Sequence, residues 1–105
     1  MAANEIHIGD IGTIFEVTLM DDVVPVDVNS ATAKKIIFEK PDGTIVENDA
    51  TFKTDGSDGI IRYTTSLASE LDQSGNWKIQ ANVTLPIGQW SSDIDRFKVY
   101  ENIKP

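Results

Sequence analysis

The sequence predicts an all-β domain, because short segments in which apolar and polar residues alternate make up most of it. Clusters of Gly, Asp, Asn and Pro separate these segments at intervals of about 8 to 15 residues, as is typical of a β-sandwich or barrel. The sequence shows neither an internal repeat nor a long segment with helical periodicity. With 105 residues the chain has the length of one domain. We expect this single domain to span residues 1–105.

The clearest strands are TIFEVTL (13–19) and WKIQANVTL (77–85), in which every second residue is apolar. MDDVVPVDVNSAT (20–32) is expected to be a connection, because Pro25 cannot donate to a central ladder. The other strands are expected at residues 5–8, 33–40, 44–52, 60–65 and 90–100. About seven antiparallel strands in a domain of this length fit an immunoglobulin-like β-sandwich best.

In the last expected strand (90–100), the apolar residues do not all alternate in the same phase. Ile94 lies on the opposite face to Phe97 and Val99 in an unbroken strand, so the three side chains cannot all face the core. A β-bulge near Asp95 and Arg96 would place them on one face. This strand and the polar segment from Ile45 to Phe52 are the two candidates for edge strands.

LDQSGNW (71–77) is expected to be a structural corner at which the chain crosses between two sheets. Leu71 and Trp77 would fill the core on either side of it. Asp72 would cap free backbone N–H groups of the turn, and Gly75 would supply a positive φ. A Trp77 side chain that faces the core presents nothing to a ligand, which favours a structural role for this segment.

The residue types that carry catalysis or hold ions occur in unfavourable arrangements. TDGSDG (54–59) lacks the ligand spacing of a calcium loop and is expected to be a plain turn. His7 is the only histidine, and Asp93 and Asp95 fit a solvated acidic strand face. There is no cysteine and no phosphate-binding glycine loop. We therefore expect a protein that is not an enzyme and that needs neither metal nor cofactor.

Composition limits the class of partner. With 17 acidic and 9 basic residues the formal charge is -8, which disfavours nucleic acid. No apolar stretch approaches the roughly 20 residues that span a bilayer, and the N-terminal residues lack the pattern of a signal peptide, so we expect neither a membrane location nor export. The absence of heptads, together with the charge, predicts that the isolated chain is mainly monomeric.

Six segments carry a resemblance to a known family: IGDIGT (8–13), PVDVNSAT (25–32), IIFEKPDGT (36–44), TDGSDGIIRYTT (54–65), LDQSGNWKIQANV (71–83) and FKVYENI (97–103). In this order they resemble the immunoglobulin-like domain at the N-terminus of phage baseplate upper proteins, and the resemblance covers nearly the whole chain. It implies a structural or accessory protein of a phage or prophage virion, in the tail, the baseplate or another part. Such a protein is made in the bacterial cytoplasm and binds other virion proteins.

Two pairs of side chains are candidates for contact with a partner. Ile14 and Met20 are outward-facing apolar residues near a predicted edge. Trp90 and Tyr100 would form a sugar-stacking platform if both were exposed on one face. That arrangement would favour the alternative function, a carbohydrate-binding module that aids adsorption to the bacterial cell surface.

Overall fold

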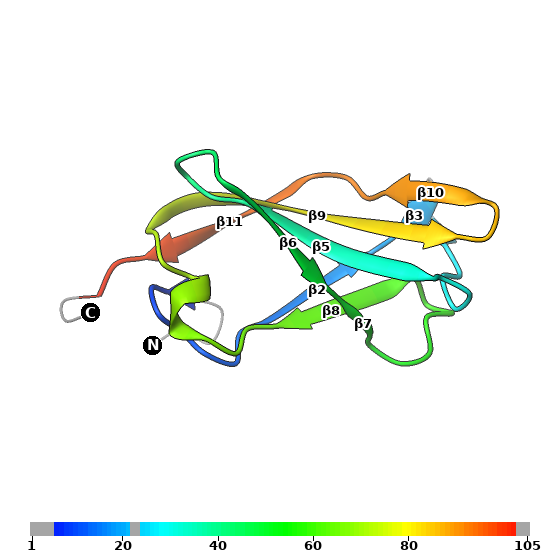
Figure 1. Cartoon of the computed structure of the whole chain (residues 1–105), viewed down its shortest axis with the longest axis horizontal. Helices are drawn as coiled ribbons and strands as arrows, with labels where there is room; N and C mark the ends of the chain where they lie inside the picture. The colour runs from blue at the N-terminus through cyan, green and yellow to red at the C-terminus, as the bar shows by residue number, and fades with distance from the viewer. Residues whose placement is uncertain (1–5, 22–23, 103–105) are drawn as a thin grey trace.

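The computed structural model describes residues 6–21 and 24–102, and these residues form an all-β architecture (Figure 1). The helical structure in this part of the chain is a short 3-10 helix, η1 (Ala68–Glu70). Within the same residues, no helix has the length and apolar character needed to cross a membrane. The strands belong to a large sheet, a small sheet and a short ribbon.

The large sheet is built around β9 (Gly75–Leu85), the longest strand. Its neighbours are antiparallel to it, whereas the two-residue strand at the N-terminal end pairs in parallel. The order across the sheet is β1 (Ile6–His7), β11 (Asp95–Tyr100), β9, β5 (Ala33–Glu39) and β6 (Ile45–Asp49), and β10 (Gly88–Ser91) also pairs with β9.

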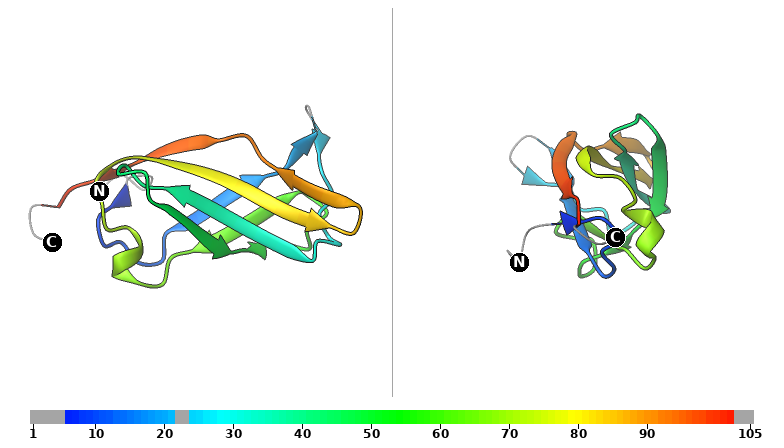
Figure 2. Two further views of the ribbon diagram at one scale, coloured as in Figure 1. Left: turned by 45° about the horizontal axis from the view of Figure 1, so that its top comes forward. Right: turned by 90° about the vertical axis from the view of Figure 1, so that its left-hand side faces the viewer.

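The small sheet faces the large one and has fewer strands. Its order is β2 (Ile14–Thr18), β8 (Ile60–Thr64) and β7 (Thr51–Phe52), and all pairs are antiparallel. β2 contacts β9 and β8 contacts β5 across the interior. Figure 2 shows β2 and β8 passing behind the large sheet. The core lies between the two sheets.

Aromatic rings fill the centre of the core. The ring centroid of Phe15 in the small sheet lies 5.0 Å from that of Phe38 and 4.9 Å from that of Phe97 in the large sheet. The Phe97 ring also stacks on Trp77 at 5.7 Å. As predicted from the alternation of β9, Trp77 is fully buried. The other buried apolar side chains are Leu19, Val28, Ile36, Ala50, Ile61, Leu71, Ile79, Ala81, Val83 and Val99.

The segment expected to be one final strand is two strands, β10 and β11, separated by a bulge. Ser91 pairs with Asn82 and Asp95 pairs with Ile79, so residues 92–94 stand opposite only residues 80–81 of β9. The extra residue therefore lies directly before Asp95, close to the predicted position near Asp95 and Arg96. It moves Trp90 and Phe97 onto the inner face, whereas Ile94 is not buried and is 53% exposed.

Two other expectations about the strands are corrected. The segment 44–52 divides at Ala50, which is buried and whose N–H donates to the carbonyl of Lys34 (3.0 Å). As a result β6 ends the large sheet and β7 ends the small sheet, so both halves are edges, as predicted. The expected connection after β2 contains a two-stranded ribbon, β3 (Met20–Asp21) and β4 (Val24–Pro25). The outer position of β4 tolerates Pro25.

Replacement of Trp77 by alanine should lower the free energy of unfolding by about 3 to 5 kcal/mol, because it removes the largest fully buried side chain and leaves a cavity. Urea denaturation of both proteins measures the difference. Trp90→Ala is the matched control and should cost clearly less, because Trp90 is 46% exposed. Equal costs for the two variants would contradict the assignment of Trp77 to the centre of the core.

Candidate functional site

The aspartates of the TDGSDG turn are engaged within the turn itself. Asp55 Oδ1 accepts hydrogen bonds from the backbone N–H (2.9 Å) and the hydroxyl (2.6 Å) of Ser57, and these bonds lower the pKa of Asp55. Asp58 accepts from the backbone N–H of Ile60 (3.0 Å) and from Thr54 Oγ1 (3.0 Å). Across residues 6–21 and 24–102, no cluster of three or more His, Cys, Asp or Glu is placed to hold a metal.

His7 lies beside Tyr100 at the end of the large sheet, where β1 pairs with β11. The two ring centroids are 5.7 Å apart, and the backbone N–H of His7 donates to Asp10 Oδ2 (2.9 Å). The residue lies in a short N-terminal strand, as expected from the sequence, but it is half-buried, not solvated.

The segment 71–77 connects the small sheet to the large one and is the structural corner that the sequence predicts. Leu71 and Trp77 are both fully buried, and the indole Nε1 of Trp77 donates to the carbonyl oxygen of Gln73 (3.0 Å). Gly75 has φ +122°, which side chains rarely adopt. These contacts hold the first residue of the buried row of β9 in position.

Asp72 does not cap the corner, contrary to the prediction. Its carboxylate instead forms an ion pair with Lys40 Nζ (2.8 Å), from the turn after β5. A second link joins the same turn, because Gln73 Nε2 donates to Asp42 Oδ2 (2.9 Å). Hydrogen bonds from Thr44 and then from Gln73 lower the pKa of Asp42. The corner and the PDG turn therefore form one polar cluster.

The structure does not bring Trp90 and Tyr100 together. Trp90 pairs with Val83 and shares its inner face, whereas Tyr100 follows the buried Val99 and points to the outer face. Val99 pairs with Gly75, so Tyr100 lies level with residue 74 of the neighbouring strand. Nine strand residues separate the two aromatic positions, a distance of about 30 Å. The two rings cannot form one stacking platform.

Ile14 and Met20 are both exposed, at 54% and 48%, as the sequence predicts. They occupy different surroundings. Ile14 begins β2, whereas Met20 begins the β3–β4 ribbon and lies near the β9–β10 hairpin. Met20 lines a hollow in the described surface.

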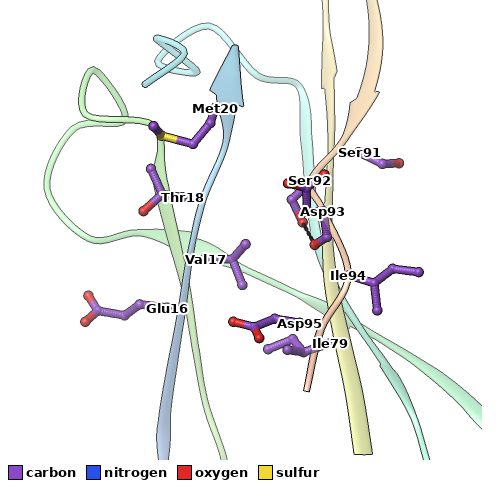
Figure 3. A pocket seen from close by; sticks show the side chains of 10 residues that line it. All are labelled: Glu16, Val17, Thr18, Met20, Ile79, Ser91, Ser92, Asp93, Ile94 and Asp95. Atoms are coloured by element: carbon purple, nitrogen blue, oxygen red, sulfur yellow. Dashed lines mark hydrogen bonds between the residues drawn. The ribbon is translucent and has the colours of Figure 1, made fainter. Parts of the chain in front are cut away.

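That hollow is the candidate functional site, and we call it the edge groove. One part, of about 770 Å³, lies between β2 and the bulge that separates β10 from β11 (Figure 3). The other part, of about 390 Å³, lies between the β3–β4 ribbon and the β9–β10 hairpin. Met20 and Ser91 line both parts, so the two parts of the groove are adjacent to one another on one side of the molecule.

The edge groove exists because the two sheets end at different places. β2 is the last strand of the small sheet on this side and lies against β9, but the large sheet continues beyond β9 into β10 and β11. The inner face of β10 and of the start of β11 is therefore uncovered within the described chain, whereas Phe97 and Val99 further along β11 pack into the core. The loss of cover is clear at Val83 and Trp90, which pair across β9 and β10 and lie on the same face of the sheet. Val83 is 1% exposed, whereas Trp90 is 46% exposed.

The lining of the groove combines apolar and acidic side chains. Its exposed apolar residues are Met20, Ile87, Trp90 and Ile94, and its carboxylates are Glu16, Asp21, Asp27, Asp93 and Asp95. No Lys, Arg or His among the described residues lines it. An exposed apolar surface rimmed by polar groups is typical of a protein-binding site. The sequence predicts Trp90 and Met20 as contact residues. It also predicts the bulge beside them, because Ile94 would lie on the opposite face to Phe97 and Val99 in an unbroken strand.

Comparison of the chain with models of known protein families and with curated protein sequences finds no match.

Replacement of Gly75 by alanine should destabilise the protein by more than about 1 kcal/mol. A Cβ there would be held at φ +122° and would lie 3.1 Å from Pro41 Cγ. Chemical denaturation of Gly75→Ala, with the exposed neighbour Asn76→Ala as control, measures the cost. A neutral or stabilising effect would contradict the strained geometry of the corner.

The free energy of unfolding should decrease as the pH falls below about 4. The pKa of Asp42 in the folded protein lies below the ordinary value of 3.8, so its contribution is present above that value and is lost as the pH falls through the folded pKa. Asp42→Asn should reduce this acid dependence, and Gln73→Ala, which removes one donor, should reduce it in part. Urea denaturation at a series of pH values tests this, and an unchanged slope for Asp42→Asn would contradict it.

Proposed function

We propose that the protein is an immunoglobulin-like β-sandwich that serves as a structural or accessory component of a phage or prophage virion. It acts through protein–protein contacts in the tail, the baseplate or another part of the particle. The resemblance of six ordered segments to the N-terminal domain of baseplate upper proteins supports the assignment to a virion. Two facing sheets, a core tryptophan and a corner that crosses between the sheets support the fold.

The edge groove is the observation that carries the proposed mode of action. Met20, Ile87 and Trp90 expose apolar surface around one hollow, and burial of such surface is the main favourable term in protein association. The carboxylates along the rim restrict which partner can bury that surface, because an unpaired carboxylate is costly to desolvate. A binding module with these properties recognises a complementary protein surface.

The alternative, a carbohydrate-binding module, loses the arrangement on which it depended. Trp90 lies in the groove, whereas Tyr100 lies on the outer face at the other end of β11. A platform for sugar stacking needs aromatic faces on one surface. The groove therefore favours a protein partner over a glycan.

Incorporation into virus particles tests the proposal. In particles produced by the phage or prophage that encodes the chain, the protein should co-purify with the virion, and Met20→Glu or Ile87→Glu should reduce its amount by about tenfold or more, equivalent to about 1.4 kcal/mol of lost affinity. Ile45→Glu is the matched control, because Ile45 is 65% exposed on the opposite edge of the large sheet.

Quantitative mass spectrometry of purified particles measures the amount of each variant, and thermal unfolding confirms that each variant folds. Absence of the unmodified chain from the particles would overturn the virion assignment. Equal incorporation of the groove variants and Ile45→Glu would overturn the assignment of the groove as the contact surface.

A further inference from the structure

The side of β2 that borders the edge groove has backbone groups without a partner strand. Thr65 N donates to the carbonyl of Thr13 (3.0 Å), and Leu19 N donates to that of Gly59 (2.8 Å), so the odd-numbered residues of this strand bond toward β8. Alternate residues of an antiparallel strand direct their N–H and C=O groups to opposite sides. Ile14, Glu16 and Thr18 therefore direct theirs away from β8, where no described strand pairs with them.

A further strand beside this edge would continue the small sheet beneath the open part of the large sheet. β2 lies against β9, and the next position in the small sheet would lie against β10 and the first part of β11. Neighbouring strands are about 4.8 Å apart and facing sheets about 10 Å apart. A strand added to β2 would therefore occupy the groove and cover the inner face of Trp90.

The other border of the groove is less suitable for strand addition. The bulge at residues 92–94 interrupts the edge formed by β10 and β11. Beyond it, the backbone N–H of Arg96 already donates to Asp95 Oδ1 (2.8 Å). Bulges of this kind prevent regular pairing. β2 thus provides the regular edge and β10 and β11 provide the facing wall.

The charges of the groove select the class of segment. Glu16 lies at the border of the groove and already forms ion pairs with Arg62 (3.1 Å) and Lys53 (3.6 Å). Asp95 pairs with Ile79 and so lies on the inner face, and its carboxylate points toward β2 beside Ile79. Asp95 forms no ion pair within residues 6–21 and 24–102. A cation from outside would complete this position.

We propose that the edge groove receives an extended segment of a partner protein, which adds to β2 as a further strand and places a lysine or arginine against Asp95. This inference rests on the proposed function and specifies its partner. Asp95 pairs with Ile79 and Trp90 pairs with Val83. Ile79 and Val83 are four residues, or about 13 Å, apart along β9. The segment therefore carries a basic side chain and a large apolar side chain four positions apart on one face.

A synthetic peptide tests this inference on the isolated protein. The acetylated and amidated peptide LTVTKTVTL has a leucine four residues from its lysine on either side, so it can add in either direction. Hydrogen exchange followed by NMR should show at least about tenfold slower exchange for the amides of Ile14, Glu16 and Thr18. The amides of Ile45 and Glu47, on the free edge of β6, are internal controls and should not change.

Fluorescence gives a second measurement at the other side of the groove. Trp77 is fully buried and Trp90 is 46% exposed, so acrylamide quenching reports mainly on Trp90. The peptide should decrease this quenching, and the peptide LTVTETVTL should not. Asp95→Lys should reverse the preference between the two peptides, whereas Glu47→Lys, on the opposite edge, should leave it unchanged.

Unchanged exchange at β2 with both peptides would overturn strand addition, and equal protection by both would overturn the role of Asp95. Protection of β2 that depends on protein concentration and occurs without peptide would assign the groove to a second copy of the chain and also overturn the proposal. These outcomes are independent of particle incorporation. Incorporation that depends on Met20 without peptide protection of β2 would leave the proposed function intact and remove strand addition alone.

Discussion

The packing of β2 against β9 determines the arrangement of the rest of the molecule. Phe15 of β2 meets Phe38 and Phe97 from the large sheet, and Phe97 stacks on Trp77. This contact places the last strand of one sheet over a central strand of the other. The large sheet then extends beyond the small sheet that covers it, so part of its inner face is left open. This open part forms the edge groove. An aromatic core in one place thus produces an open apolar surface in another.

The corner at residues 71–77 controls the same geometry from the end of the molecule. Because the Trp77 ring is buried and its Nε1 is bonded to Gln73, β9 cannot slip by one residue without moving Asn76 or Lys78 into the core. The pairing of β9 with β10 and β11 transmits this register across the sheet. The bulge then decides that Trp90 and Asp95 both face inward. The corner thereby fixes which side chains line the groove.

The sequence predicts the features that depend on neighbouring residues. The alternation that begins at Trp77 and the glycine at position 75 are local signals, and both structural expectations are confirmed. The parity conflict at Ile94 predicts a bulge near Asp95 but not which residues form it. In the structure the hydroxyl of Ser92 anchors the bulge by accepting from the backbone N–H of Ala81 (2.8 Å). Distant contacts leave no such pattern. The Asp72–Lys40 ion pair joins residues 32 positions apart, and the edge groove assembles side chains from β2, β3 and the bulge before β11. For this reason the sequence pattern does not predict the groove.

An open strand edge beside an apolar wall is a hazard as well as a binding site, because any extended chain can pair with it. The inward position of Asp95 addresses both roles. A segment without a cation would bury the Asp95 carboxylate unpaired, which costs several kcal/mol. The β2 segment of a second copy is of this kind, since residues 14–18 carry Glu16 and no basic residue. A basic segment would gain an ion pair at the same position. In the proposed complex, the charge that opposes indiscriminate pairing is therefore the charge that selects the partner.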